Sequence, residues 1–193
     1  MCAALLLARP AAAQSEGQFQ AAVQFVAAPS SEFDSTDMGI GGRVSWLPGS
    51  LFGVDAELTF FPGDFPDDGP AFSGGRVEGL FGVTAGPRIG RLRPFVKLRP
   101  GFVTYQESPE PFACILIFPP PLQCALAGGD TVFALDLGGG VEFYPTPRTV
   151  VRIDAGDRAV RFDGPVFTSD RSVEEESFFS HDFRFAVGGG LRW

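Results

Sequence analysis

The chain has 193 residues and a formal net charge of −8, and this length indicates a single domain. Hydrophobic residues make up 45% and charged residues 20%, which excludes a disordered, highly charged chain. The acidic balance argues against nucleic-acid binding, which needs a basic excess, and no apolar run reaches the roughly 20 residues of a membrane-spanning helix.

The chain begins with a candidate targeting segment, MCAALLLARPAAAQ. An apolar run is followed by Ala11 and Ala13, which fit the small-residue pattern of a secretory cleavage site before Gln14. The usual positively charged start is missing. We therefore interpret residues 1–13 as the remaining part of a signal peptide and residues 14–193 as the mature domain. A short alanine-rich helix is the alternative.

Eight segments then alternate between apolar and polar residues, as strands with two different faces do. They cover residues 18–25, 38–46, 52–60, 76–88, 96–102, 133–143, 151–156 and 182–193. Short turns alternate with longer connections, an even strand count allows closure, and the abundant glycine (25) and proline (17) disfavour long helices. The sequence therefore predicts an all-β fold, an eight-stranded antiparallel up-and-down transmembrane β-barrel.

The polar faces of these segments carry both charge signs in similar numbers. Lys97 is the only lysine among 15 basic residues, and a packed ionic interior favours the planar fork of arginine. Eight strands leave no open channel. We expect the charges of the polar faces to fill the lumen: Arg43, Asp55, Glu57, Arg76, Glu78, Lys97, Arg99, Asp136, Glu142, Arg152, Asp154, Arg184 and Arg192. The alternative is a soluble, lipocalin-like binding barrel with its apolar face inside.

Aromatic residues fall near both ends of the predicted strands, as in the two aromatic girdles of a membrane barrel. One set comprises Trp46, Tyr144 and Trp193, and the other comprises Phe60, Phe61, Phe102 and Tyr105.

The last segment alternates up to a terminal aromatic residue through Phe183, Phe185, Val187, Leu191 and Trp193. This resembles the C-terminal strand signature that the bacterial barrel-assembly machinery recognises. The mature chain resembles the small eight-stranded outer-membrane barrels of the OmpA transmembrane domain and OmpX type.

The resemblance implies a bacterial outer-membrane protein with periplasmic termini and extracellular loops. It also implies a monomer that contacts lipid, lipopolysaccharide and the assembly machinery. The expected role is structural or surface-interacting, with no cofactor.

Cys114 and Cys124 remain after removal of residues 1–13, and an even pair in an exported chain favours a disulfide. Two free thiols are the alternative. Zinc would need two further ligands, and His181 is the only histidine, so we expect no metal site.

Ser180, His181 and Asp182 contain the residue types of a hydrolase triad, but consecutive residues cannot generally form that relay. Some eight-stranded barrels modify lipid A with a histidine and a serine near the outer rim. The deacylase H-x-S pattern is absent here, because Phe183 stands at the serine position. We expect no enzyme, with a lipid A-modifying acyltransferase or deacylase as the alternative.

Overall fold

The computed structural model describes residues 18–30, 35–62, 75–106, 129–163, 166–167, 173–174 and 177–193. The predicted signal segment and the predicted Cys114–Cys124 disulfide lie outside these residues. Within them, no helix is long and apolar enough to cross a membrane. The strands are β1 (Gln18–Ser30), β2 (Ser35–Leu47), β3 (Phe52–Phe61), β4 (Arg76–Ala85), β5 (Leu92–Tyr105), β6 (Asp130–Phe143), β7 (Thr149–Asp163), β8 (Val166–Phe167), β9 (Val173–Glu174) and β10 (Ser177–Arg192).

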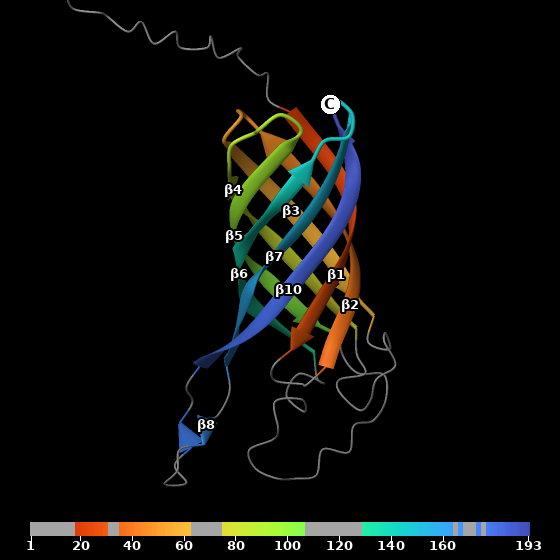
Figure 1. The fold of residues 1–193 in the computed structure, drawn as a ribbon. Coiled ribbons are helices and arrows are strands. Elements are labelled where there is room, and N and C mark those ends of the chain that lie inside the picture. The colour runs from red at the N-terminus through yellow and green to blue at the C-terminus, as the bar shows by residue number, and fades with distance from the viewer. Residues whose placement is uncertain are drawn as a thin grey trace, which may run out of the picture.

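Eight of these strands form a closed barrel in the order β1-β10-β7-β6-β5-β4-β3-β2 (Figure 1). Every neighbouring pair is antiparallel. The first and last strands close the circuit: the Phe19 amide donates to the Trp193 carbonyl at 3.0 Å, and the Trp193 amide donates to the Phe19 carbonyl at 3.0 Å. The predicted all-β, eight-stranded, up-and-down barrel is confirmed.

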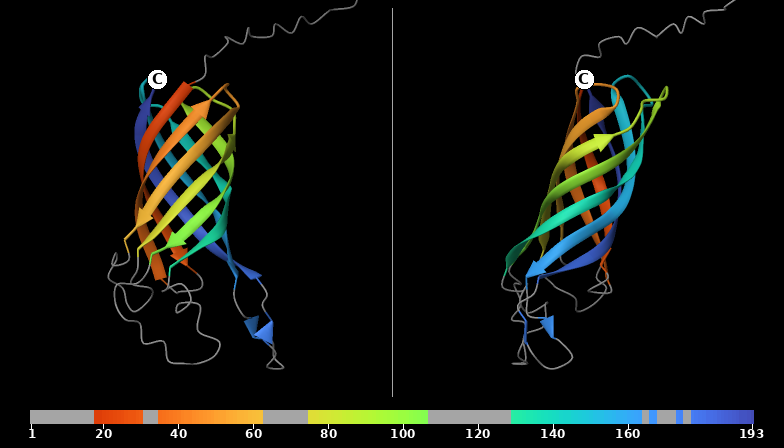
Figure 2. Two further views of the ribbon diagram at one scale, coloured as in Figure 1. Left: turned by 180° about the vertical axis from the view of Figure 1, so that it is seen from behind. Right: turned by 90° about the vertical axis from the view of Figure 1, so that its left-hand side faces the viewer.

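The two ends of the barrel differ. Short turns 48–51, 86–91 and 144–148 lie at one end, which we call the turn end. Gly90 adopts a φ of 63°, the left-handed conformation that a tight turn there requires. The other strand ends, at Ser30 and Ser35, Phe61 and Arg76, Tyr105 and Asp130, and Asp163 and Ser177, form the opposite end, which we call the loop end. Between β7 and β10, the short strands β8 and β9 pair with each other (Figure 2).

The strands β7 and β10 extend further toward the loop end than the sequence predicted. They pair as far as Asp163 with Ser177, whereas β1 pairs with β10 only as far as Ala27 with Phe185. Proline at position 29 has no amide hydrogen to continue a ladder, which fits the end of the β1–β10 pairing there. The β7–β10 pair therefore continues beyond the closed barrel (Figure 1).

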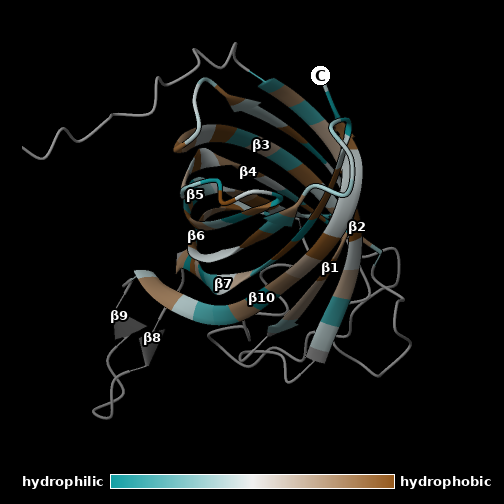
Figure 3. Ribbon diagram, turned by 45° about the horizontal axis from the view of Figure 1, so that its top comes forward, coloured by the Kyte–Doolittle hydropathy of each residue, from teal (hydrophilic) through white to brown (hydrophobic). Residues whose placement is uncertain are grey.

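The barrel is apolar outside and polar inside, the reverse of a soluble barrel. Large apolar side chains on the outer wall are strongly exposed, for example Phe25 (63%), Phe81 (61%) and Leu58 (57%). Hydrophobic and hydrophilic residues alternate along each strand (Figure 3). Such an outer wall contradicts the lipocalin-like alternative, which requires a polar exterior.

The aromatic girdles are smaller than expected. Trp46, Phe60, Phe102 and Trp193 are exposed on the outer wall, but Phe61, Tyr105 and Tyr144 are buried. The difference from the expected girdles follows from the pleat of a strand. Consecutive residues point to opposite faces, so Phe60 and Phe61 cannot both face outward.

Candidate functional site: the charged barrel interior

All thirteen charged residues expected in the lumen are buried, and none is more than 7% exposed. Several of their ion pairs join strands that are not neighbours in the barrel. Arg152 Nη1 of β7 lies 2.7 Å from Asp55 Oδ2 of β3, and Arg99 Nη1 of β5 lies 2.6 Å from Glu57 Oε2 of β3. Such pairs must cross the lumen, so these side chains lie inside the barrel.

Glu57 lies at the centre of this arrangement. One of its carboxylate oxygens accepts from Arg99 and the other from Arg184. Arg184 Nε also donates to Glu78 Oε1 at 2.9 Å. One carboxylate thus bridges two guanidinium groups, which compensates part of the cost of burying all three charges.

The contacts continue from Glu57 toward both ends. On the loop side, Arg158 donates to Glu78 Oε2 and Asp182 Oδ2, each at 2.8 Å. On the turn side, the pairs run from Arg99 through Asp136, Lys97 (3.0 Å from Asp136) and Asp154 to Arg152. Arg152 contacts both Asp55 and Glu142, and Glu142 also pairs with Arg93.

We call this connected set the lumenal charge network. It consists of Arg93, Lys97, Arg99, Arg152, Arg158, Arg184, Asp55, Glu57, Glu78, Asp136, Glu142, Asp154 and Asp182. Six cations oppose seven carboxylates, so the set is nearly neutral.

Three of the expected residues lie outside this network. Arg76 Nη1 pairs with Asp37 Oδ2 at 2.7 Å near the loop end. Arg43 and Arg192 form no ion pair with any described residue. Instead, Arg43 donates to Gln24 Oε1 at 3.4 Å, and Arg192 donates to Gln18 Oε1 at 2.6 Å.

Three members of the network were not in the expected lumenal set. Asp182 begins the last predicted segment, on its polar face, whereas Arg93 and Arg158 lie outside the predicted segments, which began at 96 and ended at 156. The strands β5 and β7 include both arginines. Counting in steps of two from Lys97 to Arg93 and from Asp154 to Arg158 places both arginines on the charged faces of their strands, although Phe95 is apolar.

An apolar layer inside the loop-end half was also missed. Side chains there are buried within the barrel rather than on its outer wall: Leu80, Val103, Tyr105, Val132, Ala134, Val160 and Phe162 in one cluster, and Val26, Ala28, Phe61 and Ala186 in a second. The interior therefore changes from ionic to apolar toward the loop end.

Tyr144 closes the turn end of the network from the turn after β6. Its hydroxyl donates to Glu142 Oε2 at 2.5 Å and accepts from Gln20 Nε2 at 3.4 Å. Burial first, and then the negative charge of Glu142, raise the pKa of Tyr144 to about 12.

This pKa predicts a loss of stability in strong base. The folded pKa lies above the unfolded value of about 10, so the contribution of Tyr144 is complete below pH 10 and is lost as the pH rises toward 12. The chain has two tyrosines, so tyrosinate absorbance of a Tyr105→Phe variant isolates Tyr144. A midpoint near 10 in the folded protein would contradict the expectation.

The residues of the triad-like sequence do not meet. His181 is exposed on the outer wall, and its Nδ1 lies 2.8 Å from Asp157 Oδ2, whereas Ser180 and Asp182 are buried inside. Alternation along β10 places His181 on the opposite face from Ser180 and Asp182, so the three form no catalytic relay. Among the described residues, no group of three or more His, Cys, Asp and Glu side chains is placed to hold a metal ion.

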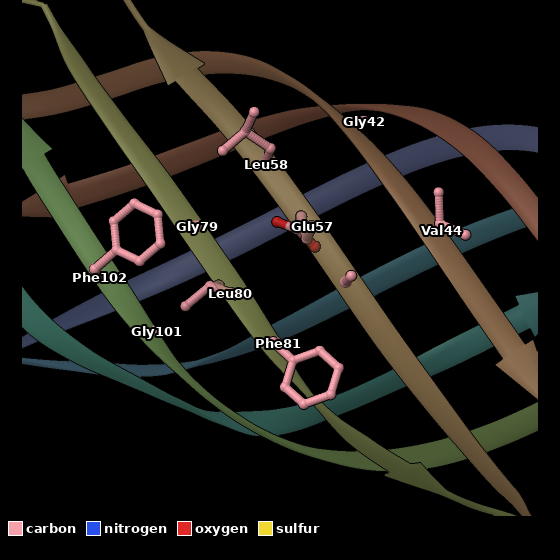
Figure 4. Close-up of a pocket in the computed structure, with 10 residues that line it drawn as sticks. Gly42, Val44, Glu57, Leu58, Gly79, Leu80, Phe81, Gly101 and Phe102 are labelled. Atoms are coloured by element: carbon pink, nitrogen blue, oxygen red, sulfur yellow. The ribbon is translucent and has the colours of Figure 1, made fainter.

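The outer wall carries the terminal apolar set and shallow grooves. Phe183, Phe185, Val187, Leu191 and Trp193 are all exposed there. A groove of about 390 Å³ runs over β2 to β5, where small Gly42 and Gly101 lie among larger apolar side chains such as Phe81 and Phe102 (Figure 4).

No protein-family model matches the sequence, and no curated protein matches it. Solved structures match the fold. Neisserial surface protein A has 14% identity and a TM-score of 0.52, with 91% of this chain and 96% of that chain covered. The N-terminal β-barrel domain of Pseudomonas aeruginosa OprF has 11% identity and a TM-score of 0.51, with 92% and 100% covered.

The outer-membrane protein OprG of Pseudomonas aeruginosa has 11% identity and a TM-score of 0.51, with 92% of this chain and 96% of that chain covered. Identities this low establish a shared architecture only. The chain has the fold of small eight-stranded outer-membrane β-barrels.

Proposed function

We propose that this chain, which has the fold of small outer-membrane β-barrels, is a bacterial outer-membrane protein with a structural or surface-interaction role. The observation that carries the proposal is the inverted wall, with exposed apolar side chains outside and charges buried inside a closed barrel. Only a closed barrel or a helix satisfies every backbone group within lipid. The outer wall then faces hydrocarbon.

The lumen is a plug rather than a pore in this proposal. The pairs of Glu57 with Arg99 and Arg184 span the interior at its centre. An eight-stranded barrel encloses only enough space for such side chains. We therefore expect a monomer without stable ion conductance.

The topology in this proposal follows the usual layout of such barrels. The turn end and both termini face the periplasm, and the loop end faces outward. The alternating terminal segment, with Trp193 at its end, serves as the recognition signal for the barrel-assembly machinery. Membrane lipid and lipopolysaccharide contact the outer wall and rim.

The test is expression behind a complete signal peptide, followed by membrane fractionation. We expect the protein in the outer membrane, migrating faster on a gel when unboiled than when boiled. A Trp193→Ala variant should lose most of this assembled form, whereas Trp46→Ala, which removes an equally aromatic outward residue elsewhere, should retain it. Folded protein in the soluble periplasmic fraction would contradict the proposal.

The His181–Asp157 pair is the observation that keeps a lipid A-modifying enzyme as the second candidate. We expect His181→Ala to leave the lipid A mass spectrum of expressing cells unchanged, because Ser180 points into the barrel and not toward His181. A lipid A species that appears with the wild type and disappears with this variant would establish the enzyme instead.

A further inference from the structure

The turn end of the barrel concentrates positive charge. Arg88, Arg91, Arg93, Arg148 and Arg192 lie in the segments 83–95, 141–151 and 190–193. Glu142 is the only carboxylate side chain in these segments, and Arg93 and Arg152 already pair with it. The described residues at this end therefore carry an uncompensated positive charge.

Two of these arginines share one aromatic ring. The guanidinium carbons of Arg88 and Arg192 each lie 4.6 Å from the centroid of the Tyr144 ring. They are therefore separated by at most twice that distance. Two like charges within this distance repel each other, and an anion bound beside both would relieve the repulsion.

A small cavity adjoins this ring. It has a volume of about 60 Å³ and is lined by Gln18, Leu47, Gly49, Ser50, Arg88, Arg93 and Tyr144. Arg192 does not line it but lies against the Tyr144 ring that does. A single water needs about 10 to 15 Å³ on this kind of measure, and drug-sized ligands need about 300 Å³ or more. The cavity is therefore suited to one small polyatomic group.

Hydrogen-bond donors remain for such a group. Arg192 is 7% exposed, and its buried Nη1 has no hydrogen-bond partner among the described residues. Arg88 donates from Nε to the Gly90 carbonyl at 3.3 Å, which fixes its guanidinium beside the cavity. By contrast, Arg93 is fully engaged by Glu142, Thr84 and two backbone carbonyls, so it contributes charge only.

We propose that the Arg88–Tyr144–Arg192 cluster binds a phosphate group. Guanidinium groups present paired donors that match phosphate oxygens, and a tetrahedral oxyanion suits the size of the cavity. The phosphate comes from inorganic phosphate or from a phospholipid headgroup at the adjacent membrane surface. Both ligands present the same phosphate group to the site.

The test is calorimetric titration of the folded protein in phosphate-free maltoside detergent at constant ionic strength. One arm adds inorganic phosphate and the other adds a short-chain phosphatidylglycerol. We expect saturable binding in at least one arm and a loss of at least about tenfold in affinity for Arg88→Gln. Arg148→Gln removes an exposed arginine of the same end that does not line the cavity, and it should bind as the wild type does.

The arms identify the source of the phosphate. Saturation by the inorganic ion shows that the free ion is sufficient, and saturation by the phospholipid alone assigns the headgroup. Equal weakening by the two arginine variants, or no binding in either arm, would overturn the proposal. Heat-modifiable migration is checked on each sample, so a folded barrel that fails to bind contradicts this site without contradicting the proposed membrane function.

Discussion

Replacing Glu57 by alanine is expected to lower the free energy of unfolding by about 3 to 5 kcal/mol, because one deletion leaves two buried guanidinium groups without their shared carboxylate. Arg99 retains Asp136, and Arg184 retains Glu78, but each loses its contact with Glu57. Both side chains are fully buried, so water cannot replace the lost partner without opening the interior.

Urea unfolding in lipid vesicles measures this loss. Trp46 and Trp193 are the only tryptophans, and both lie on the outer wall, so their fluorescence reports transfer from lipid to water. Asp130→Asn is the matched control, since it removes an exposed carboxylate at the loop end of β6 and should change stability by less than about 1 kcal/mol. A Glu57 variant as stable as this control would show that the network contributes nothing to stability.

The second large effect is expected at Gly101. A Cβ built there would lie 1.9 Å from the Gly79 carbonyl oxygen of the neighbouring strand, an impossible contact that only backbone movement relieves. We expect Gly101→Ala to destabilise the barrel by about 3 kcal/mol, since strands β4 and β5 must separate locally.

Gly42 provides a control within the same outer groove. The nearest atom to a Cβ at that position is the Ala22 carbonyl oxygen, at 4.0 Å, an ordinary contact. Both substitutions restrict the unfolded chain equally, so their difference isolates the steric clash. Equal unfolding midpoints for Gly42→Ala and Gly101→Ala would contradict the close approach of β4 and β5.

The strands could be predicted from the sequence because each strand separates two unlike environments, one apolar and one polar. Alternation of apolar and polar residues marks both faces of β3, where Asp55 and Glu57 point inward and Leu58 points outward. The aromatic pattern misplaced Phe61 and Tyr105 at the loop end, since both point inward. Asp157 and His181, which lay outside the predicted strands, are polar yet point outward. At the loop end the interior is itself apolar, so the polarity of a residue there no longer indicates whether its side chain points inward or outward.

The partners within the interior could not be predicted from the sequence. Arg184 and Glu57 lie 127 positions apart, and their contact depends on the stagger of all intervening strands. The turn-end site has the same origin, because Arg88, Tyr144 and Arg192 come from three separate segments. Charge composition predicts a filled interior, but the register of the closed barrel decides which charges meet.

The pairing between β1 and β10, which closes the barrel, is almost uncharged on its inner side. Over the paired length, β1 presents Gln20, Ala22 and Gln24 inward, opposite the inward glycines 188 and 190 of β10, and Arg192 at the turn end is the only charge. The lumenal charge network lies entirely on β3 to β7 and β10. A curled sheet of these strands can gather its charges before the first and last strands meet. Closure of the β1–β10 pairing then requires no ion pair between these two strands.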